Sequence, residues 1–215
     1  LIAALLSPEL QSTRAVVLTG AEGTFSAGAD LKEMSSSGET EDVSDASRLF
    51  TAFRRANPVI IGAVRKYALG LGSGVAMASD LVIAGDDAQF GYPEIEHGLV
   101  AGITMVRLKE LLGDRKAMEL VITGRRVLAA EALDLGLVNE VVPTETSLDR
   151  ALEIARQIAT RSPLAVHTTK KFFYEAADMS YGSALSAGER VITLLRASKE
   201  AKAGASAFAH REGKA

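Results

Sequence analysis

Two short apolar runs, each followed by small residues and then by a helical pattern, constrain the fold of this chain most strongly. They are 15–19 (AVVLT), which precedes the segment 26–30 (SAGAD), and 59–64 (VIIGAV), which precedes the segment 70–74 (GLGSG). Runs rich in β-branched residues are typical of buried strands. Because strands that alternate with helices form parallel sheets, we expect an α/β protein.

The rest of the chain continues this alternation and then becomes helical. Further strands are predicted at 80–84, 88–91 and 136–142. Helices are predicted at 1–10, 30–34, 46–56, 75–79, 103–112, 115–122 and 129–135, and after Pro143 at 148–161, 163–178 and 183–210. We therefore expect an α/β core over 1–142 and a helical C-terminal subdomain over 143–215.

Composition and charge exclude several classes of protein. With 47% hydrophobic and 24% charged residues among 215, the chain has the composition of an ordinary folded domain. A net charge of −3 disfavours a nucleic-acid partner, and the absence of cysteine excludes a disulfide scaffold and a thiol nucleophile. Three scattered histidines predict no metal site. The absence of cysteine fits a cytoplasmic protein. The longest apolar stretch, 58–64, is too short to cross a bilayer, so we expect no membrane partner.

The two small-residue segments share one design that could carry chemistry. A turn from a strand into a helix presents free backbone N–H groups at the positive end of the helix dipole. Two such turns side by side could converge on one carbonyl oxygen and form an oxyanion hole. The alternative is that the small residues only permit close packing of helix on strand. The residues alone leave both interpretations open.

Two other glycine motifs are excluded by spacing. The glycines at 70, 72 and 74 resemble a dinucleotide-binding loop, but G-x-G-x-x-G requires glycine at 75, which is valine. Ser73 resembles a nucleophile elbow, but G-x-S-x-G requires glycines at 71 and 75, which are leucine and valine. We reject both interpretations.

Glu94 is the candidate acid/base group. It lies in the segment 90–95 (FGYPEI), where apolar neighbours could desolvate its carboxylate and raise its pKa towards the working range of a general base. A surface glutamate beside a turn is the plainer interpretation. His97 could serve the same pocket or lie on its rim. Asp80 is predicted to cap the end of a strand or helix.

Taken together, several ordered segments resemble one family. They are 15–20, 25–34 (FSAGADLKEM), 67–70 (YALG), 76–84, 88–94 (AQFGYPE), 117–124 (AMELVITG) and 130–138. Over essentially its whole length the chain resembles the crotonase superfamily, the enoyl-CoA hydratases and isomerases. Several motifs in the right order and at the right separations are far more specific than any single glycine loop.

The resemblance implies a crotonase-like (ClpP/crotonase) fold, with a spiral core of parallel sheet and C-terminal helices that pack on neighbouring subunits in a homotrimer or a hexamer made of two trimers. It implies an acyl-CoA substrate, with CoA as part of that substrate and no separate cofactor. The thioester enolate would be held by the backbone N–H groups of Ala29 and Leu71, with leucine in place of the usual glycine. The segments around these amides would bind the substrate through Ser26, Ala27, Asp30, Leu31, Lys32 and Gly70.

Departures from the family pattern bear on the reaction. Two-carboxylate hydratases carry a glutamate where this chain has Gly74, whereas the second family glutamate is present as Glu94. A single base suits the shift of a double bond from 3-enoyl-CoA to 2-enoyl-CoA better than the addition of water. Gly102 stands where relatives that shift dienes have an aspartate.

Other outcomes stay open from the sequence. A hydratase could borrow a second acid group from Glu96 or His97, and a silent member of the family could bind acyl-CoA without turnover. The family fold also opens with a strand hairpin and a helix, which we expect to precede Leu1 in the intact protein.

Overall fold

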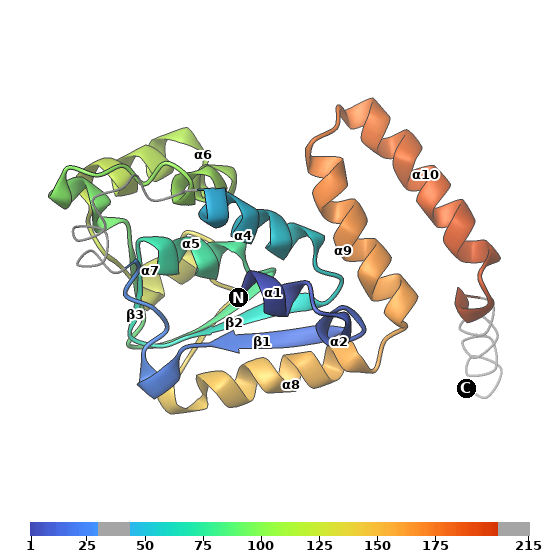
Figure 1. Ribbon diagram of the computed structural model, residues 1–215, viewed down its shortest axis with the longest axis horizontal. Coiled ribbons are helices and arrows are strands. Elements are labelled where there is room, and N and C mark those ends of the chain that lie inside the picture. The colour runs from blue at the N-terminus through green and yellow to red at the C-terminus, as the bar shows by residue number, and fades with distance from the viewer. Residues whose placement is uncertain (30–43, 202–215) are drawn as a thin grey trace.

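The computed structural model describes residues 1–29 and 44–201, which form two sheets covered by helices (Figure 1). The elements in chain order are α1 (Ile2–Leu5), α2 (Pro8–Gln11), β1 (Ala15–Thr19), η1 (Ala21–Gly23), α4 (Ser44–Arg55), β2 (Val59–Val64), β3 (Tyr67–Leu69), α5 (Leu71–Ala78), β4 (Leu81–Gly85), β5 (Gln89–Gly91), η2 (Pro93–His97), α6 (Thr104–Thr123), β6 (Val127–Leu128), α7 (Ala129–Asp134), β7 (Glu140–Val142), η3 (Thr144–Thr146), α8 (Ser147–Ala159), α9 (Pro163–Ala177) and α10 (Tyr181–Ala197).

The larger sheet has four parallel strands in the order β1-β2-β4-β7. Its strand β2 is a continuous apolar run because helices cover both of its faces. Ile60 packs with Leu5 and Phe53 on one face, and Ile61 packs with Ala151 of α8 on the other. In Figure 1, α8 runs beneath β1 and β2, whereas α4 and α5 lie above them. The predicted strands at 15–19 and 59–64, and the parallel sheet, are confirmed.

A smaller sheet has the order β3-β5-β6, with β3 and β5 parallel and β5 and β6 antiparallel. Strand β2 leads into β3 through Lys66, whose φ is +53°. The chain that follows β1 reaches the same sheet through a bridge between Ser26 and Ala68. The sequence did not predict β3 or β6, because strands of two or three residues are too short to show periodicity.

The start of α5 corrects the sequence prediction, which placed a turn over 70–74 and a helix from Val75. The structure begins the helix at Leu71, and Gly70 alone makes the turn, with φ +53° and ψ −122°. Such a conformation is open to glycine and costly for other residues. Gly72 and Gly74 are helical, and both lie so close to neighbouring residues that a side chain would not fit.

Other boundaries differ for local reasons. The helix predicted over 1–10 is two short helices, because Ser7 caps α2 and Pro8 opens it. Of the strand predicted over 136–142, the structure forms only Glu140–Val142 (β7), because the Leu137 N–H donates a hydrogen bond to the Ala132 carbonyl of α7. The break predicted between 112 and 115 is present as Gly113, with φ +72°, inside α6. The helix predicted over 30–34 lies outside the described residues.

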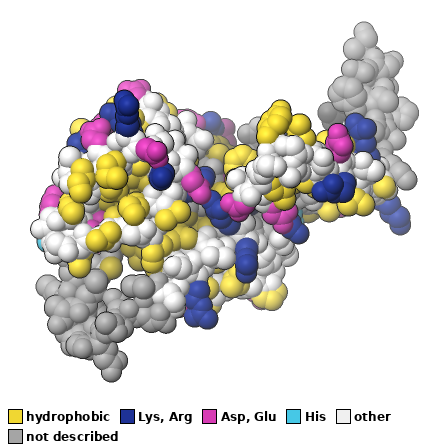
Figure 2. Space-filling model, turned by 90° about the horizontal axis from the view of Figure 1, so that it is seen from above, with side chains coloured by type: hydrophobic (Ala, Val, Ile, Leu, Met, Phe, Trp, Pro, Cys, Tyr) yellow, Lys and Arg dark blue, Asp and Glu magenta, His cyan; other side chains and the backbone are white. Residues whose placement is uncertain are grey.

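The C-terminal helices differ in how they pack. Helix α8 covers the sheet through Ala151 and its neighbours, although the predicted division at residue 142 assigns it to the C-terminal part. Helices α9 and α10 project to one side of the body (Figure 1). Figure 2 shows hydrophobic side chains among charged ones both on the main body and along these projecting helices. The division at 142 and the role of 143–215 in assembly stay predictions.

A buried ion pair ties α9 to the sheet. The Lys170 ammonium lies 2.7 Å from Oδ2 of Asp80 and donates a hydrogen bond of 2.8 Å to the Pro58 carbonyl. The same Asp80 oxygen accepts from Ile60 N–H at 2.7 Å, so Asp80 caps β2 as predicted. The other oxygen accepts from the Tyr174 hydroxyl at 2.8 Å. Burial lowers the pKa of Lys170, and the Asp80 carboxylate opposes that change.

Removal of the Lys170 ammonium should destabilise the protein. Lys170→Ala leaves the Asp80 carboxylate buried without its cation, and we expect the free energy of unfolding to fall by about 3–5 kcal/mol. Lys171→Ala is the control, because its side chain is 74% exposed on the same helix, and it should change stability by less than about 0.5 kcal/mol. Urea unfolding measures both, and equal losses would contradict a structural role for the pair.

Candidate active site

The segment after β1 and the segment after β3 lie against each other. Ser26 N–H donates to the Tyr67 carbonyl at 2.8 Å, and Leu69 N–H donates to the Ser26 carbonyl at 3.0 Å. The Ser26 hydroxyl accepts from Gly28 N–H at 3.3 Å and so shapes the turn that follows. Residues 26–29 are therefore held beside the end of β3 and the first turn of α5.

Glycine is required where these two segments approach most closely. A Cβ on Gly28, whose φ is +104°, would lie 2.9 Å from the Leu69 carbonyl oxygen and 3.8 Å from the Leu71 nitrogen. A Cβ on Gly72 would lie 2.6 Å from the Ser26 carbonyl oxygen. Real Cβ atoms do not approach backbone oxygens this closely, so the small residues do serve close packing. That packing also brings the backbone of 28–29 next to Leu71.

Two backbone donors are left free at this contact. Leu71 is the first residue of α5, so its N–H has no acceptor within the helix. Neither Leu71 N–H nor Ala29 N–H has an acceptor among residues 1–29 and 44–201. Ala29 is exposed and Leu71 is half-buried. Each free amide can therefore donate a hydrogen bond to a ligand oxygen, and that of Leu71 does so at the positive end of a helix.

Glu94 lies beside the same contact, at the second position of η2. Its Oε1 is 3.3 Å from the position of a Cβ on Gly70, the residue before Leu71. Its Oε2 is buried and has no hydrogen-bond partner within the described part of the chain. Burial raises the pKa of the Glu94 carboxyl, and a hydrogen bond from its own backbone N–H opposes the rise. A carboxylate of raised pKa therefore stands next to a free helix-terminal amide.

Comparison with known proteins gives the family. A sequence model of the enoyl-CoA hydratase/isomerase family matches residues 1–214. The chain belongs to this family. Both the predicted family and the predicted fold class are thereby confirmed.

Individual relatives are named as hydratases. The chain is 34% identical over 194 residues to the 2,3-dehydroadipyl-CoA hydratase of Escherichia coli K12, covering 89% of this chain and 76% of that protein. It is 40% identical over 191 residues to a probable mitochondrial enoyl-CoA hydratase of Dictyostelium discoideum, covering 86% and 66%. A crystal structure of enoyl-CoA hydratase from Mycobacterium tuberculosis H37Rv is 37% identical, with a TM-score of 0.86 over 98% of this chain and 82% of that chain.

Some of the predicted site residues are described by the structure and others are not. Among the described ones, Glu94, Gly70 and Leu71 come together, and Ser26, Ala27 and Ala29 belong to the segment held beside them. The predicted substrate-binding residues Asp30, Leu31 and Lys32 lie outside the described residues. The Ala27 side chain is exposed, and the Ser26 hydroxyl accepts a hydrogen bond from the Gly28 N–H in the same turn.

An apolar wall fills the space beside Gly74, where two-carboxylate hydratases carry their other glutamate. A Cβ at this position would lie 2.7 Å from Cγ2 of Thr104 and 2.8 Å from Cζ of Phe50. Sequence reasoning identified the missing carboxylate but not this wall. Phe50 is one apolar residue on an amphipathic helix, and Thr104, the other residue of the wall, lies 54 positions further along the chain. No local sequence pattern could therefore have indicated this contact.

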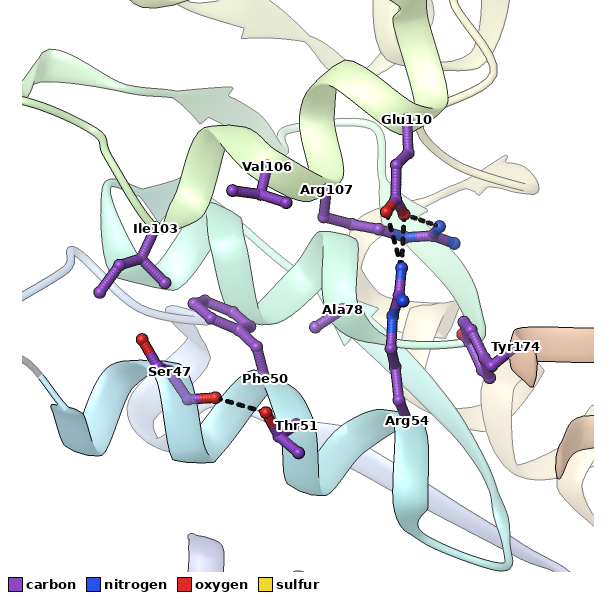
Figure 3. A pocket seen from close by; sticks show the side chains of 10 residues that line it. All are labelled: Ser47, Phe50, Thr51, Arg54, Ala78, Ile103, Val106, Arg107, Glu110 and Tyr174. Carbon is purple, nitrogen blue, oxygen red and sulfur yellow. Dashed lines mark hydrogen bonds and ion pairs between the residues drawn. The ribbon is translucent and has the colours of Figure 1, made fainter. Parts of the chain in front are cut away.

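The Phe50 ring also lines a cavity of about 270 Å³ between α4, α5, α6 and α9 (Figure 3). The ring shares the cavity with Ala78, Ile103 and Val106, which make one end of it apolar. The other end is lined by charged side chains. In it the Glu110 carboxylate accepts from the guanidinium groups of Arg54 and Arg107, each at 2.7 Å. Because Ala78 lies one helical turn beyond Gly74, the cavity begins directly behind the apolar wall.

The described residues hold no group of three or more His, Asp or Glu side chains that could bind a metal ion. None of the helices among them combines the length and the apolar character that a bilayer crossing requires.

The contact between Gly72 and Ser26 should tolerate no side chain. Gly72→Ala forces a methyl group against a backbone oxygen, and we expect the free energy of unfolding to fall by about 1–3 kcal/mol. Gly182→Ala is the matched control, because a Cβ there meets nothing within 4 Å on α10. It should raise stability by up to about 1 kcal/mol. Chemical unfolding of the two variants should give changes of opposite sign.

Proposed function

We propose that this protein shifts the double bond of an acyl-CoA thioester from the 3-enoyl to the 2-enoyl position, with Glu94 as its single acid/base group. The observation that carries the proposal is the apolar wall at Gly74, which leaves one carboxylate at the site. The chain spans 66–76% of the length of the two relatives described above, so the activity of the whole protein is itself part of the proposal.

The free amides of Ala29 and Leu71 support the first half of the chemistry. Removal of a proton from C2 of a thioester places negative charge on the carbonyl oxygen. Two N–H donors about 2.7–3.1 Å from that oxygen stabilise the charge as it develops. Because both donors belong to the backbone, leucine at position 71 retains the function of the usual glycine.

Glu94 supports the second half. Its carboxylate takes the C2 proton, and the electrons of the C2–H bond form the enolate. When the carbonyl re-forms, the enolate electrons form C2=C3, and the electrons of the C3=C4 bond take the same proton at C4. Atoms and charge balance without a second group. A base works best when its pKa lies near the working pH, and burial raises the pKa of Glu94 in that direction.

Hydration of 2-enoyl-CoA is the second candidate, and the names of the relatives, which are hydratases, favour it. Addition of water benefits from a group that positions the water in addition to the group that delivers the proton. The wall of Phe50 and Thr104 fills the place of the usual second carboxylate. Glu96 and His97 lie on the same η2 segment and are exposed, but the Glu96 carboxylate is directed towards Gly124.

We also propose a homotrimer or hexamer as the working assembly. Helix α10 supports this proposal, because Leu185, Ile192 and Leu194 are each more than half exposed on it. Such side chains on a projecting helix are suited to burial against another subunit. The predicted CoA contacts, including that of Lys32, belong to the same proposal.

Loss of the Glu94 carboxylate should abolish isomerisation. Glu94→Gln keeps the shape of the side chain but cannot accept the proton, and we expect turnover of 3-enoyl-CoA to fall by about 10²–10⁴-fold. Glu96→Gln is the control on the same segment and should retain activity within a few fold. The assay compares 3-enoyl-CoA with 2-enoyl-CoA. Hydration as fast as isomerisation in the unmodified protein would contradict the preferred reaction, and an unaffected Glu94→Gln variant would contradict the base.

The apolar wall should decide whether a second carboxylate can act. Gly74→Glu alone forces its side chain into Phe50 and Thr104, so we expect lower stability and no gain in hydration. The double variant Phe50→Ala with Gly74→Glu provides room, and we expect it to hydrate 2-enoyl-CoA at least tenfold faster than Gly74→Glu does. Phe50→Ala alone is the control for the added space. Hydration gained by Gly74→Glu without the second change would show that the wall is not the obstacle.

A further inference from the structure

Three buried polar atoms near the proposed base have no hydrogen-bond partner within the described part of the chain. They are the hydroxyl oxygens of Ser73 and Tyr92 and Oε2 of Glu94. Ser73 is 1% exposed and Tyr92 is 2% exposed. Buried polar groups are nearly always paired, because an unpaired one loses its bonds to water without replacement. Three unpaired atoms in one place therefore point to a shared function.

Backbone contacts bring the three residues together. Gly70 N–H donates to the Gly91 carbonyl at 2.9 Å, which places the residue after Gly91, Tyr92, beside the first turn of α5. Ser73 belongs to that turn. Glu94, two residues beyond Tyr92, has its Oε1 against Gly70. The three residues thus lie around the first turn of α5, which begins at Leu71.

The Tyr92 phenol lies within electrostatic reach of both Ser73 and Glu94. Burial is the main cause that raises the pKa of the Tyr92 phenol, so the phenol keeps its proton across the working pH range. The nearby Ser73 hydroxyl opposes the rise, and the negative charge of Glu94 adds to it. Neither hydroxyl yet makes a hydrogen bond of ordinary geometry. The cluster therefore holds donors on Ser73 and Tyr92 and one charged acceptor on Glu94.

We propose that Tyr92 is a positioning residue for Glu94: its phenol donates a hydrogen bond to Oε2 of the ionised carboxylate, and the Ser73 hydroxyl donates to the phenol oxygen in turn. Oε1, beside Gly70, is then the oxygen that carries the proton. This inference rests on the proposed function of Glu94 as the base.

The arrangement has a mechanistic purpose. One oxygen must reach both C2 and C4 of the substrate while the proton is in transit. A carboxylate whose other oxygen is held cannot rotate away, so less reorganisation accompanies each transfer. A hydrogen bond to the charged form also favours ionisation, which keeps a buried carboxylate available as a base.

Tyr92→Phe tests the proposal, because it removes only the hydroxyl. We expect kcat to fall by about tenfold or more with KM changed by less than threefold. The acid limb of the kcat/KM profile should move to higher pH by about one unit, since the carboxylate loses a donor that favoured its charged form. Ser73→Ala should move the limb in the same direction by a smaller amount. Tyr181→Phe is the matched control, because that phenol is 81% exposed on α10, and it should change neither quantity.

Other groups near Glu94 do not account for such a shift. Within the described residues, Tyr92 is the titratable side chain coupled to Glu94. The Glu96 carboxylate is directed towards Gly124, and His97 is exposed at the end of η2. An acid limb that stays in place in both Tyr92→Phe and Ser73→Ala would overturn the proposal, even if both variants were less stable.

A readout without turnover separates this inference from the proposed function. Infrared difference spectra of the free protein, with Glu94→Gln as the reference, report the protonation of Glu94 directly. The midpoint should rise in Tyr92→Phe. If Glu94→Gln is inactive and the midpoint does not move in Tyr92→Phe, the positioning role fails and the base remains. If Glu94→Gln is fully active, the proposed function fails, whatever Tyr92→Phe does to the midpoint.

Discussion

Close contact between two backbone segments is the constraint on which the rest of this site depends. The turn that follows β1 can lie against the start of α5 only because Gly28 and Gly72 have no side chain. Two amides on these segments have no partner within the described residues, and Gly70 lies against the Glu94 carboxylate. Packing and chemistry are thus not rival explanations of the glycine-rich sequence. The glycines serve packing, and the packing brings together the segments that carry the free donors.

The surroundings of Glu94 are arranged by burial rather than by neighbouring cations. Desolvation is the largest influence on its pKa, and neither an arginine nor a lysine of the described residues is among the causes of the shift. Asp80, by contrast, is paired with the buried ammonium of Lys170. A carboxylate paired in this way serves stability. An unpaired one of raised pKa is suited to proton transfer.

Much of this arrangement could be predicted from the sequence, and the limits have physical causes. The strands at 15–19 and 59–64 were predicted because a strand buried on both faces reads as a continuous apolar run. The short strands β3 and β6 were not, because two or three residues carry no periodicity. The missing carboxylate at Gly74 was visible in the sequence, but the wall that replaces it was not. Phe50 and Thr104 come from distant elements, and only the fold brings them together.

The use of main-chain donors has an evolutionary consequence. In the proposed mechanism, the enolate is stabilised by the backbone N–H groups of residues 29 and 71 and not by their side chains. Substitution of either side chain therefore leaves the N–H donor in place. The half-buried Leu71 side chain is thereby released to shape the neighbouring surface. Substitutions at such positions can then change substrate preference during evolution, while the backbone donors that stabilise the enolate are retained.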